Sequence, residues 1–288
     1  MIEQLEDLLQ KRCEEYVTEA SGTGNRKAIA KTELMQSRNA EIVRVHARGT
    51  IETNSQRDEE QKTRYRVHWQ YLIKQEELLY LEEEIECREA GFLNGELASD
   101  EAVPKPEQAE PVEEGPVSSA AEERSPFVYD RLQAVKYADT WWNEYNPAYQ
   151  TFENDCTNYI SQCLRAGGAP MRGQPNRSRG WWYSGNVWSY SWSVAHALNL
   201  YLQNSVDGLR AKEVSGPEEL LLGDIICYDF EGDGRFNHNT IVTAKDYYGM
   251  PLVNAHTFDS RHRYWSYEDS SAYTPNIKYK FYTIADDA

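Results

Sequence analysis

The chain has 288 residues, 40% of them hydrophobic, which is enough to bury a core in each of two domains. Its formal net charge of −17 argues against a nucleic-acid site, because such a site needs a concentrated basic face to release counterions from phosphates. The same excess of acidic residues argues against binding to anionic membranes or anionic wall polymers.

The opening segment predicts an amphipathic helix, because apolar residues recur at helical spacing among charged ones: Ile2, Leu5, Leu8, Leu9 and Tyr16. The segment has no continuous apolar stretch, so it indicates neither a signal peptide nor a membrane span. On this ground we expect a cytoplasmic protein, with export by a route other than a signal peptide as the alternative.

Two β-strands are expected next, because apolar and polar residues alternate over residues 43–53 and again over residues 65–73. Residues 78–89 favour a third strand, for which the many glutamates make a helix the competing prediction. As strands, the three segments would form an antiparallel meander with one face in water, packed under the helix. We expect residues 1–99 to form a small α+β domain without a catalytic site, which binds a protein partner or positions the rest of the chain.

A flexible acidic linker is predicted at residues 100–125, because this stretch holds four prolines, many glutamates and almost no large apolar side chain. The second domain would then cover residues 126–288. The cysteines, at positions 13, 87, 156, 163 and 227, form no CxxC pair and no zinc-type pattern with the histidines. We therefore expect reduced thiols, no metal and no cofactor.

The second domain opens with a predicted helix at residues 130–144 and then reaches the segment FENDCTNYISQCL. Within it, Cys156 follows Asp155, which can act as a helix N-cap, at the start of an apolar run with helical spacing. Unpaired N–H groups and the dipole at a helix N-terminus favour the thiolate over the thiol. Cys156 is therefore a candidate nucleophile, whereas Cys163 is expected to be a core residue.

A partner for this thiol is His238. Residues 224–228 and 240–244 predict the two strands of a hairpin, joined by a polar, Gly-rich turn. His238 would lie at the mouth of the second strand, from where an imidazole can reach a neighbouring helix N-terminus and take the proton of a thiol. The acidic turn itself also suits calcium, but the ligand spacing of a calcium loop is missing, so we expect a sharp turn without metal.

A third polar group is expected on the next strand, PLVNAHT, at residues 251–257. Its period of two places Asn254 and His256 on the same face. Either side chain could orient the imidazole of His238, and Asp259, just beyond the strand, is a third option.

The segment GWWYSGNVWSY, residues 180–190, is rich in aromatic residues and has two interpretations. Exposed rings could stack on a sugar or clamp a peptide, or they could cap the core of a small domain. We expect some of Trp181, Trp182 and Trp188 to be buried and at least one to line the substrate groove. A further helix is predicted at residues 191–201.

The second domain resembles a known family, the putative amidase domain of Bacillus- and Clostridium-type proteins, over residues 126–284. The motifs that carry the resemblance are FENDCTNYISQCLRAGG, GWWY, YSWSVAHAL, LLLGDIICYDFEGDGRFNHNTIVT and VNAHTFDSR. The family is similar to papain-like cell-wall hydrolases of the CHAP and NlpC types, which implies helices packed on a small antiparallel sheet. The resemblance matches Cys156, His238 and His256 to the family's cysteine and two histidines. The chain departs from the family pattern at Asn237 and Tyr159, neither of which removes a catalytic atom.

The resemblance implies a cysteine-dependent amide hydrolase that acts through a thioester on a peptide or N-acyl amide, with a peptidoglycan stem peptide or muropeptide as one example. The oxyanion would be stabilised by the backbone N–H of Cys156, helped by the side chain of Gln150 or Asn154. Two alternatives remain. One is a non-catalytic module that binds peptide or sugar on a papain-like scaffold, and the other is a metal-dependent hydrolase.

Overall fold

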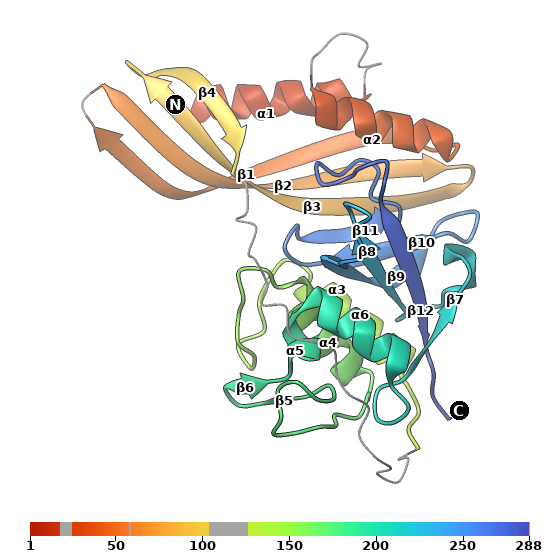
Figure 1. Ribbon diagram of the computed structural model, residues 1–288. Helices are drawn as coiled ribbons and strands as arrows, with labels where there is room; N and C mark the ends of the chain where they lie inside the picture. Colours follow the sequence, from red (N-terminus) through yellow and green to blue (C-terminus); the bar gives the residue numbers. More distant parts are fainter. Residues whose placement is uncertain (18–24, 58, 104–125, 288) are drawn as a thin grey trace. The chain divides into compact units, whose positions relative to one another are not determined.

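The computed structural model describes residues 1–17, 25–57, 59–103 and 126–287. The chain divides into two compact units, each of which mixes helices with antiparallel strands (Figure 1). The first unit comprises the described residues up to 103, together with Phe258–Ser260 and Tyr267–Ser271, and the second comprises the remainder. The α+β prediction is thus confirmed. Within the described ranges, no helix is long and apolar enough to cross a membrane.

Two helices, α1 (Ile2–Val17) and α2 (Arg26–Ser37), begin the first unit. The first is the predicted amphipathic helix, and it buries a stripe formed by Leu5, Leu9, Cys13 and Tyr16. The second was not predicted. It begins at Asn25, whose side chain accepts a hydrogen bond from the backbone N–H of Ala28, as an N-cap residue does.

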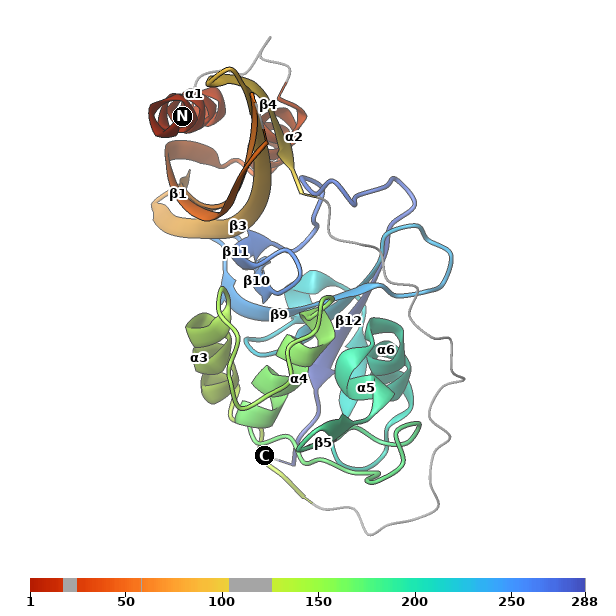
Figure 2. The same cartoon turned by 90° about the vertical axis from the view of Figure 1, so that its left-hand side faces the viewer.

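The sheet of the first unit contains four antiparallel strands: β1 (Glu41–Arg57), β2 (Glu60–Gln75), β3 (Leu78–Leu93) and β4 (Glu96–Ala102). The predicted meander is confirmed, and residues 78–89 are strand. The sheet is strongly curved, and α1 and α2 lie on its concave face (Figure 2). The alternation predicted in β2 is borne out by five side chains that are at most 2% exposed: Tyr65, Val67, Trp69, Tyr71 and Ile73.

The strand β4 corrects the predicted start of the linker. Asp100, Glu101 and Ala102 pair with β3, and the side chain of Asp100 is only 4% exposed. Residues 100–102 are therefore strand and not linker, and the buried charge of Asp100 is paired with Arg12 and Arg88. The rest of the predicted linker, residues 104–125, lies outside the described residues.

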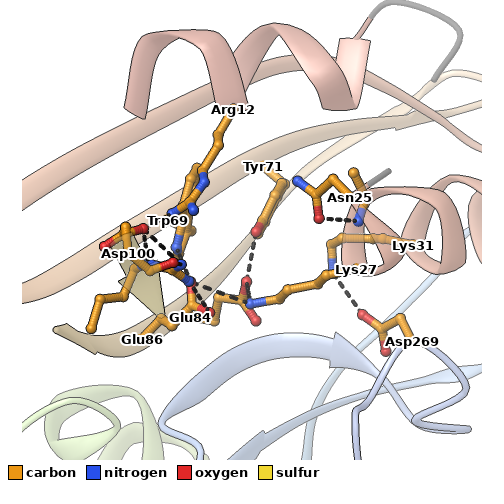
Figure 3. A network of polar contacts seen from close by, with 12 residues as sticks. Arg12, Asn25, Lys27, Lys31, Trp69, Tyr71, Glu84, Glu86, Asp100 and Asp269 are labelled. Atoms are coloured by element: carbon orange, nitrogen blue, oxygen red, sulfur yellow. Dashed lines mark hydrogen bonds and ion pairs between the residues drawn. The ribbon is translucent and has the colours of Figure 1, made fainter. Parts of the chain in front are cut away.

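The inner face of this sheet carries an unusual number of charges, which form a polar network under the helices (Figure 3). Glu84 accepts a hydrogen bond of 2.6 Å from the hydroxyl of Tyr71 and lies 2.7 Å from the ammonium of Lys27. The ammonium of Lys31 is fully buried between two carboxylates, those of Glu82 and Asp269. Burial of these ions is tolerated because each is paired with opposite charge.

The second unit has a sheet with the strand order β11-β10-β9-β8-β12-β7, in which neighbouring pairs from β10 to β7 are antiparallel. Three helices, α3, α4 and α6, pack against the central strand β9. The elements of this unit have the following bounds: α3 Arg131–Trp141, α4 Cys156–Ala166, β5 Tyr183–Ser184, β6 Val187–Trp188, α5 Tyr190–Ser193, α6 Ala195–Asn204, β7 Ala211–Val214, the 3₁₀ turn Pro217–Glu219, β8 Ile225–Asp229, β9 His238–Lys245, β10 Pro251–Ala255, β11 Ser260–Tyr264 and β12 Lys278–Ile284.

Two of the predicted helices have other bounds in the structure. The helix expected at residues 130–144 ends at Trp141, and its N-cap is Asp130, which accepts from the backbone N–H of Gln133. The helix expected at residues 191–201 is split at Val194, whose extended backbone separates α5 from α6. The predicted hairpin is confirmed, with Tyr228 paired to His238 and Ile225 paired to Ile241.

Candidate active site

Cys156 is the first residue of α4, a helix whose first nine residues are all buried. The helix is held on several sides by the core, so the position of the thiol at its N-terminus is fixed by packing. Cys156 itself is 5% exposed. Cys163 is a fully buried core residue, as predicted, and burial raises the pKa of its thiol and that of Cys227, which keeps both in the neutral form.

The helix α4 is capped by Thr257 and not by the side chain of Asp155. The hydroxyl of Thr257 accepts hydrogen bonds from the backbone N–H groups of Asp155, at 3.0 Å, and Cys156, at 3.1 Å. Asp155 occupies the N-cap position, but its side chain makes no capping hydrogen bond. Thr257 has a φ of 77°, a left-handed conformation that is costly for a β-branched residue and is maintained only where surrounding contacts impose it.

The carboxylate of Asp155 is instead bound to His256. The Nδ1 atom of His256 lies 2.8 Å from Oδ2 of Asp155, and its Nε2 atom lies 2.6 Å from the backbone oxygen of Trp141. The ring stacks on Tyr159 with a centroid distance of 4.0 Å. Both side chains of the pair are nearly excluded from water, with exposures of 3% for His256 and 1% for Asp155. Because both ring nitrogens have other partners, His256 does not orient His238 in this structure.

Asn254 is likewise occupied elsewhere. Its Oδ1 atom accepts from the hydroxyl of Thr243, at 2.7 Å, and from the backbone N–H of His262, at 2.9 Å. Its Nδ2 atom donates to Asp139, at 3.1 Å. Asp259, the third option for orienting the imidazole, belongs to the first unit. Asn254 therefore serves to fix the end of β10 and the start of β11.

His238 is the first residue of β9, at the strand mouth where it was predicted. Its neighbour Asn239 donates from Nδ2 to the hydroxyl of Thr157, at 2.9 Å, and Thr157 directly follows Cys156. This hydrogen bond joins the start of β9 to the start of α4, so the candidate base and the candidate nucleophile begin adjacent elements. The imidazole is 4% exposed and lies among aromatic rings, with the centroid of Tyr228 5.6 Å away.

The turn before His238 is organised by Asp229. Its carboxylate accepts from the backbone N–H groups of Gly232, Asp233 and Gly234, at 2.7 to 3.2 Å. These bonds explain the sharp acidic turn without a cation. Across the described residues, no group of three or more His, Cys, Asp or Glu side chains is arranged to hold a metal ion.

The predicted oxyanion donors are placed as follows. The N–H of Cys156 is directed at the hydroxyl of Thr257. Gln150 is exposed, its Nε2 atom donates to the backbone carbonyl of Thr151, and its backbone carbonyl accepts from the side chain of Asn158. Asn154 is half-buried in the loop just before the helix. The role of all three in stabilising an oxyanion stays a prediction.

The aromatic segment is divided between core and surface. Trp181 and Trp182 are at most 1% exposed and their indole N–H groups are bonded internally, so of the three candidate substrate-binding tryptophans these two are the buried ones, and their rings are part of the core. Trp188 is partly exposed. Its ring meets the edge of Phe152, at 4.8 Å, and stacks on Tyr183, at 6.1 Å, so it forms an aromatic row that leads to the loop before Cys156.

The sequence indicated Asp155 as the N-cap of α4, but it did not predict the contacts that hold the helix start in place. Asp155, Thr257 and the carbonyl of Trp141 become partners only when segments about 100 residues apart come together. One feature of the sequence could have indicated these contacts. Thr257 directly follows His256 and Asp155 directly precedes Cys156, and both have side-chain oxygens that can accept from backbone N–H groups or bind an imidazole.

Comparison with known proteins identifies the second unit. Residues 128–282 match the profile of a family described as "Putative amidase domain". The chain is 52% identical over 269 residues to the uncharacterized protein YhbB of Bacillus subtilis (strain 168), covering 89% of this chain and 85% of that protein. It is 30% identical over 126 residues to the uncharacterized protein YjcM of the same organism, covering 41% of this chain and 28% of that protein. No solved structure matches. The chain therefore belongs to the putative amidase domain family.

Proposed function

We propose that the protein is a cysteine-dependent amide hydrolase, related to the papain-like enzymes, that acts on a peptide or N-acyl amide. Membership of the amidase family supports the reaction class. The hydrogen bond between Asn239 and Thr157 is the observation that carries the mechanism, because it ties the residue after His238 to the residue after Cys156. A peptidoglycan stem peptide is one substrate of this chemical class.

In the proposed reaction, the thiolate of Cys156 attacks the amide carbonyl carbon, and the imidazolium of His238 gives its proton to the leaving amine. A thioester between the acyl group and Cys156 results. Water then attacks the thioester while His238 takes its proton, and the carboxylic acid and the thiolate are released. The N-terminus of α4 stabilises the thiolate before each cycle, because its N–H groups and dipole favour negative charge.

His256 acts through Asp155 in this proposal. The Asp155 carboxylate accepts from the backbone N–H of Phe152, at 3.1 Å, and from Asn158 of α4, at 2.9 Å, while His256 holds its second oxygen. The pair thereby fixes the loop that delivers Cys156 to the substrate. Asn254 positions the following turn. His256 and Asn254 are thus positioning residues in this proposal, whereas Cys156 is the nucleophile and His238 is the base.

The oxyanion donor requires one local change. The N–H of Cys156 is bonded to Thr257, so it can bind the oxyanion only if the substrate oxygen replaces or shares that hydroxyl. Gln150 is exposed at the entrance of the same loop, where its amide could turn toward the substrate.

A second candidate function is a non-catalytic module that binds a peptide or a sugar. It is favoured by the hydrogen bond from the N–H of Cys156 to Thr257, because this N–H is then not open to an oxyanion. In such a module the aromatic row of Phe152, Tyr183 and Trp188 would bind the ligand and the thiol would remain inert.

The two candidates are separated by turnover. The purified protein is incubated with a panel of N-acyl amides and a cell-wall digest, and new amino groups are measured. We expect release of amine by the wild-type protein, loss of at least about a hundredfold in Cys156→Ala and His238→Ala, and retention in the matched core variant Cys163→Ala. Binding of a panel member without release of amine would favour the second candidate, and an active Cys156→Ala variant would refute the mechanism.

A further inference from the structure

The polypeptide that follows the candidate nucleophile has a charge opposite to that of the whole chain. From Cys156 to Val206 there are four arginines, no lysine and no acidic residue, in a protein whose net charge is −17. Three of the arginines, Arg172, Arg177 and Arg179, lie in one loop between α4 and β5, and Arg172 forms an ion pair of 3.3 Å with Asp207. A positive segment next to a thiol points to an anionic group on the molecule that binds there.

This arginine loop, residues 172–180, is rigidly built. Its ends are closed by two backbone hydrogen bonds of 3.0 Å between Arg172 and Trp181. The buried indole N–H of Trp182 donates from inside to the carbonyl groups of Asn176 and Arg179, each at 3.1 Å. The buried tryptophan thus holds the loop in one conformation, which lowers the entropic cost of binding through it.

Arg177 is the side chain of this loop that is best prepared to bind a ligand. Its Nε atom donates to the carbonyl of Trp188, at 3.0 Å, and its guanidinium lies over the rings of Trp188, at 5.5 Å, and Tyr190, at 4.9 Å. Its own carbonyl accepts from the backbone N–H of Tyr190, at 2.9 Å. The residue is exposed, and no acceptor among the described residues is bonded to its two terminal amino groups.

A chain of contacts leads from Arg177 to the thiol. Arg177 covers Trp188, the ring of Trp188 meets the edge of Phe152 at 4.8 Å, and the backbone N–H of Phe152 is bonded to Asp155 at 3.1 Å. Asp155 directly precedes Cys156. The guanidinium therefore lies at the far end of an aromatic row that begins at Phe152, in the loop before the candidate nucleophile.

We propose that Arg177 binds a carboxylate of the substrate, which is thereby a peptide or N-acyl amino acid with a free carboxyl group on the Trp188 side of the scissile amide. The inference rests on the proposed function for the scissile amide, but binding of the carboxylate does not depend on the thiol. A planar guanidinium donates two parallel hydrogen bonds to a carboxylate, and one stacked on aromatic rings loses little conformational freedom in doing so. The local positive charge offsets the repulsion that the acidic chain exerts on an anion.

The role of Arg177 is tested by measuring how carboxylate and amide probes bind to the inactive Cys156→Ala protein. The probes are N-acetyl-Ala-Ala and its C-terminal amide, titrated by calorimetry or NMR. We expect the carboxylate to bind about tenfold more tightly than the amide, because a hydrogen bond between two charged groups is stronger than one between a charged and a neutral group. Arg177→Gln should abolish this preference, and Arg177→Lys, which keeps the charge but not the planar fork, should retain part of it. The matched variant Arg179→Gln, which removes the same charge from the same loop, should keep the preference in full.

The proposal is overturned if the wild-type loop does not distinguish the two probes, if Arg179→Gln removes the preference as fully as Arg177→Gln, or if inorganic phosphate binds more tightly than the carboxylate. Thermal unfolding of each variant shows that it is folded. A carboxylate preference without any turnover by the wild-type protein would support this site and refute the amidase mechanism. Turnover without a preference for the carboxylate would support the amidase mechanism and refute the carboxylate site at Arg177.

Discussion

At the scale of single residues, the pair His256 and Asp155 is the most constrained feature of the candidate site. Both ring nitrogens of His256 have an oxygen partner, Oδ2 of Asp155 at 2.8 Å and the backbone oxygen of Trp141 at 2.6 Å. The pair is shielded from water, so removing His256 takes away the partner of Oδ2 of Asp155, while Oδ1 keeps its hydrogen bonds from Phe152 and Asn158.

We predict that His256→Ala lowers the free energy of unfolding by about 3–5 kcal/mol, because it removes a buried ring that stacks on Tyr159 and takes the partner of Oδ2 of Asp155 away in a site closed to water. Adding Asp155→Asn to His256→Ala should recover part of that loss, since a neutral amide costs less to bury than a carboxylate. Urea unfolding of the two single variants and the double variant measures both effects. A double variant as unstable as the sum of the single variants would refute the coupling.

At the scale of elements, the start of α4 depends on a residue from beyond the end of β10. Thr257 satisfies two of the N–H groups that every helix leaves unpaired at its N-terminus, including that of Cys156. This arrangement makes the strand β10 and the helix α4 a single unit at the point where the thiol is presented.

We predict that Thr257→Val destabilises the protein by about 1–3 kcal/mol for each stranded N–H group, while Thr257→Ser, which keeps the hydroxyl, costs less than half as much. Chemical denaturation gives the stabilities. Equal losses for the valine and serine variants would show that the methyl group, and not the hydroxyl, holds the helix start.

The elements differ in how well the sequence predicts them, for physical reasons. The strand β2 follows the period of two so closely that Tyr65 to Ile73 could be assigned to one face directly. The helix α2 escaped detection because one of its inward positions is a lysine, Lys31, which is buried only because acids from distant segments pair with it. The strand β4 looked like linker because Asp100 is acidic.

Some residues of the candidate site could likewise be predicted from the sequence, and others could not. Cys156 and His238 could be placed at a helix start and a strand mouth because these positions follow from local patterns. The partners of His256 and the burial of Trp181 and Trp182 could not be predicted from the sequence. An aromatic or polar side chain looks the same in sequence whether it faces a core, a backbone carbonyl or a substrate.

At the scale of the whole molecule, each unit has a core of its own, and they are built differently. The core of the second unit is apolar and aromatic, whereas the first unit adds the buried network of acids, lysines and arginines (Figure 3). Ion pairs of this kind stabilise little by themselves, but a broken pair is expensive. The stability of the first unit should therefore depend on charge-altering substitutions in this network and on pH.

We predict that Lys31→Met lowers the unfolding free energy by about 3–5 kcal/mol, because Glu82 and Asp269 lose the ammonium that is buried between them. The matched variant Lys74→Met removes the same charge from an exposed pair with Glu41 and should cost less than about 1 kcal/mol. Thermal or urea unfolding compares the two, and similar losses would mean that the buried network is not stabilised by this pairing.

Acid should weaken the same network at Asp100. Burial alone would raise the pKa of this carboxyl, but hydrogen bonds from Arg88 and Tyr65 and the charge of Arg12 lower it overall. A carboxyl with a depressed folded-state pKa contributes stability above its unfolded pKa of about 3.9 and loses that contribution as the pH falls toward its folded-state value. We therefore predict that stability falls below about pH 4 and that Asp100→Asn, although less stable at pH 7, is less sensitive to acid. An unchanged acid slope in that variant would contradict this assignment.

The most direct test of the central claim is the rate at which iodoacetamide labels each cysteine of the native protein as a function of pH, read by peptide mass spectrometry. We expect Cys156 to react well below about pH 8, and Cys163 and Cys227 to stay unlabelled because burial raises the pKa of their thiols. We also expect His238→Ala to remove the reactivity of Cys156 at low pH. Uniform slow labelling of all the thiols, or a Cys156 profile unchanged by His238→Ala, would contradict a thiolate paired with this histidine.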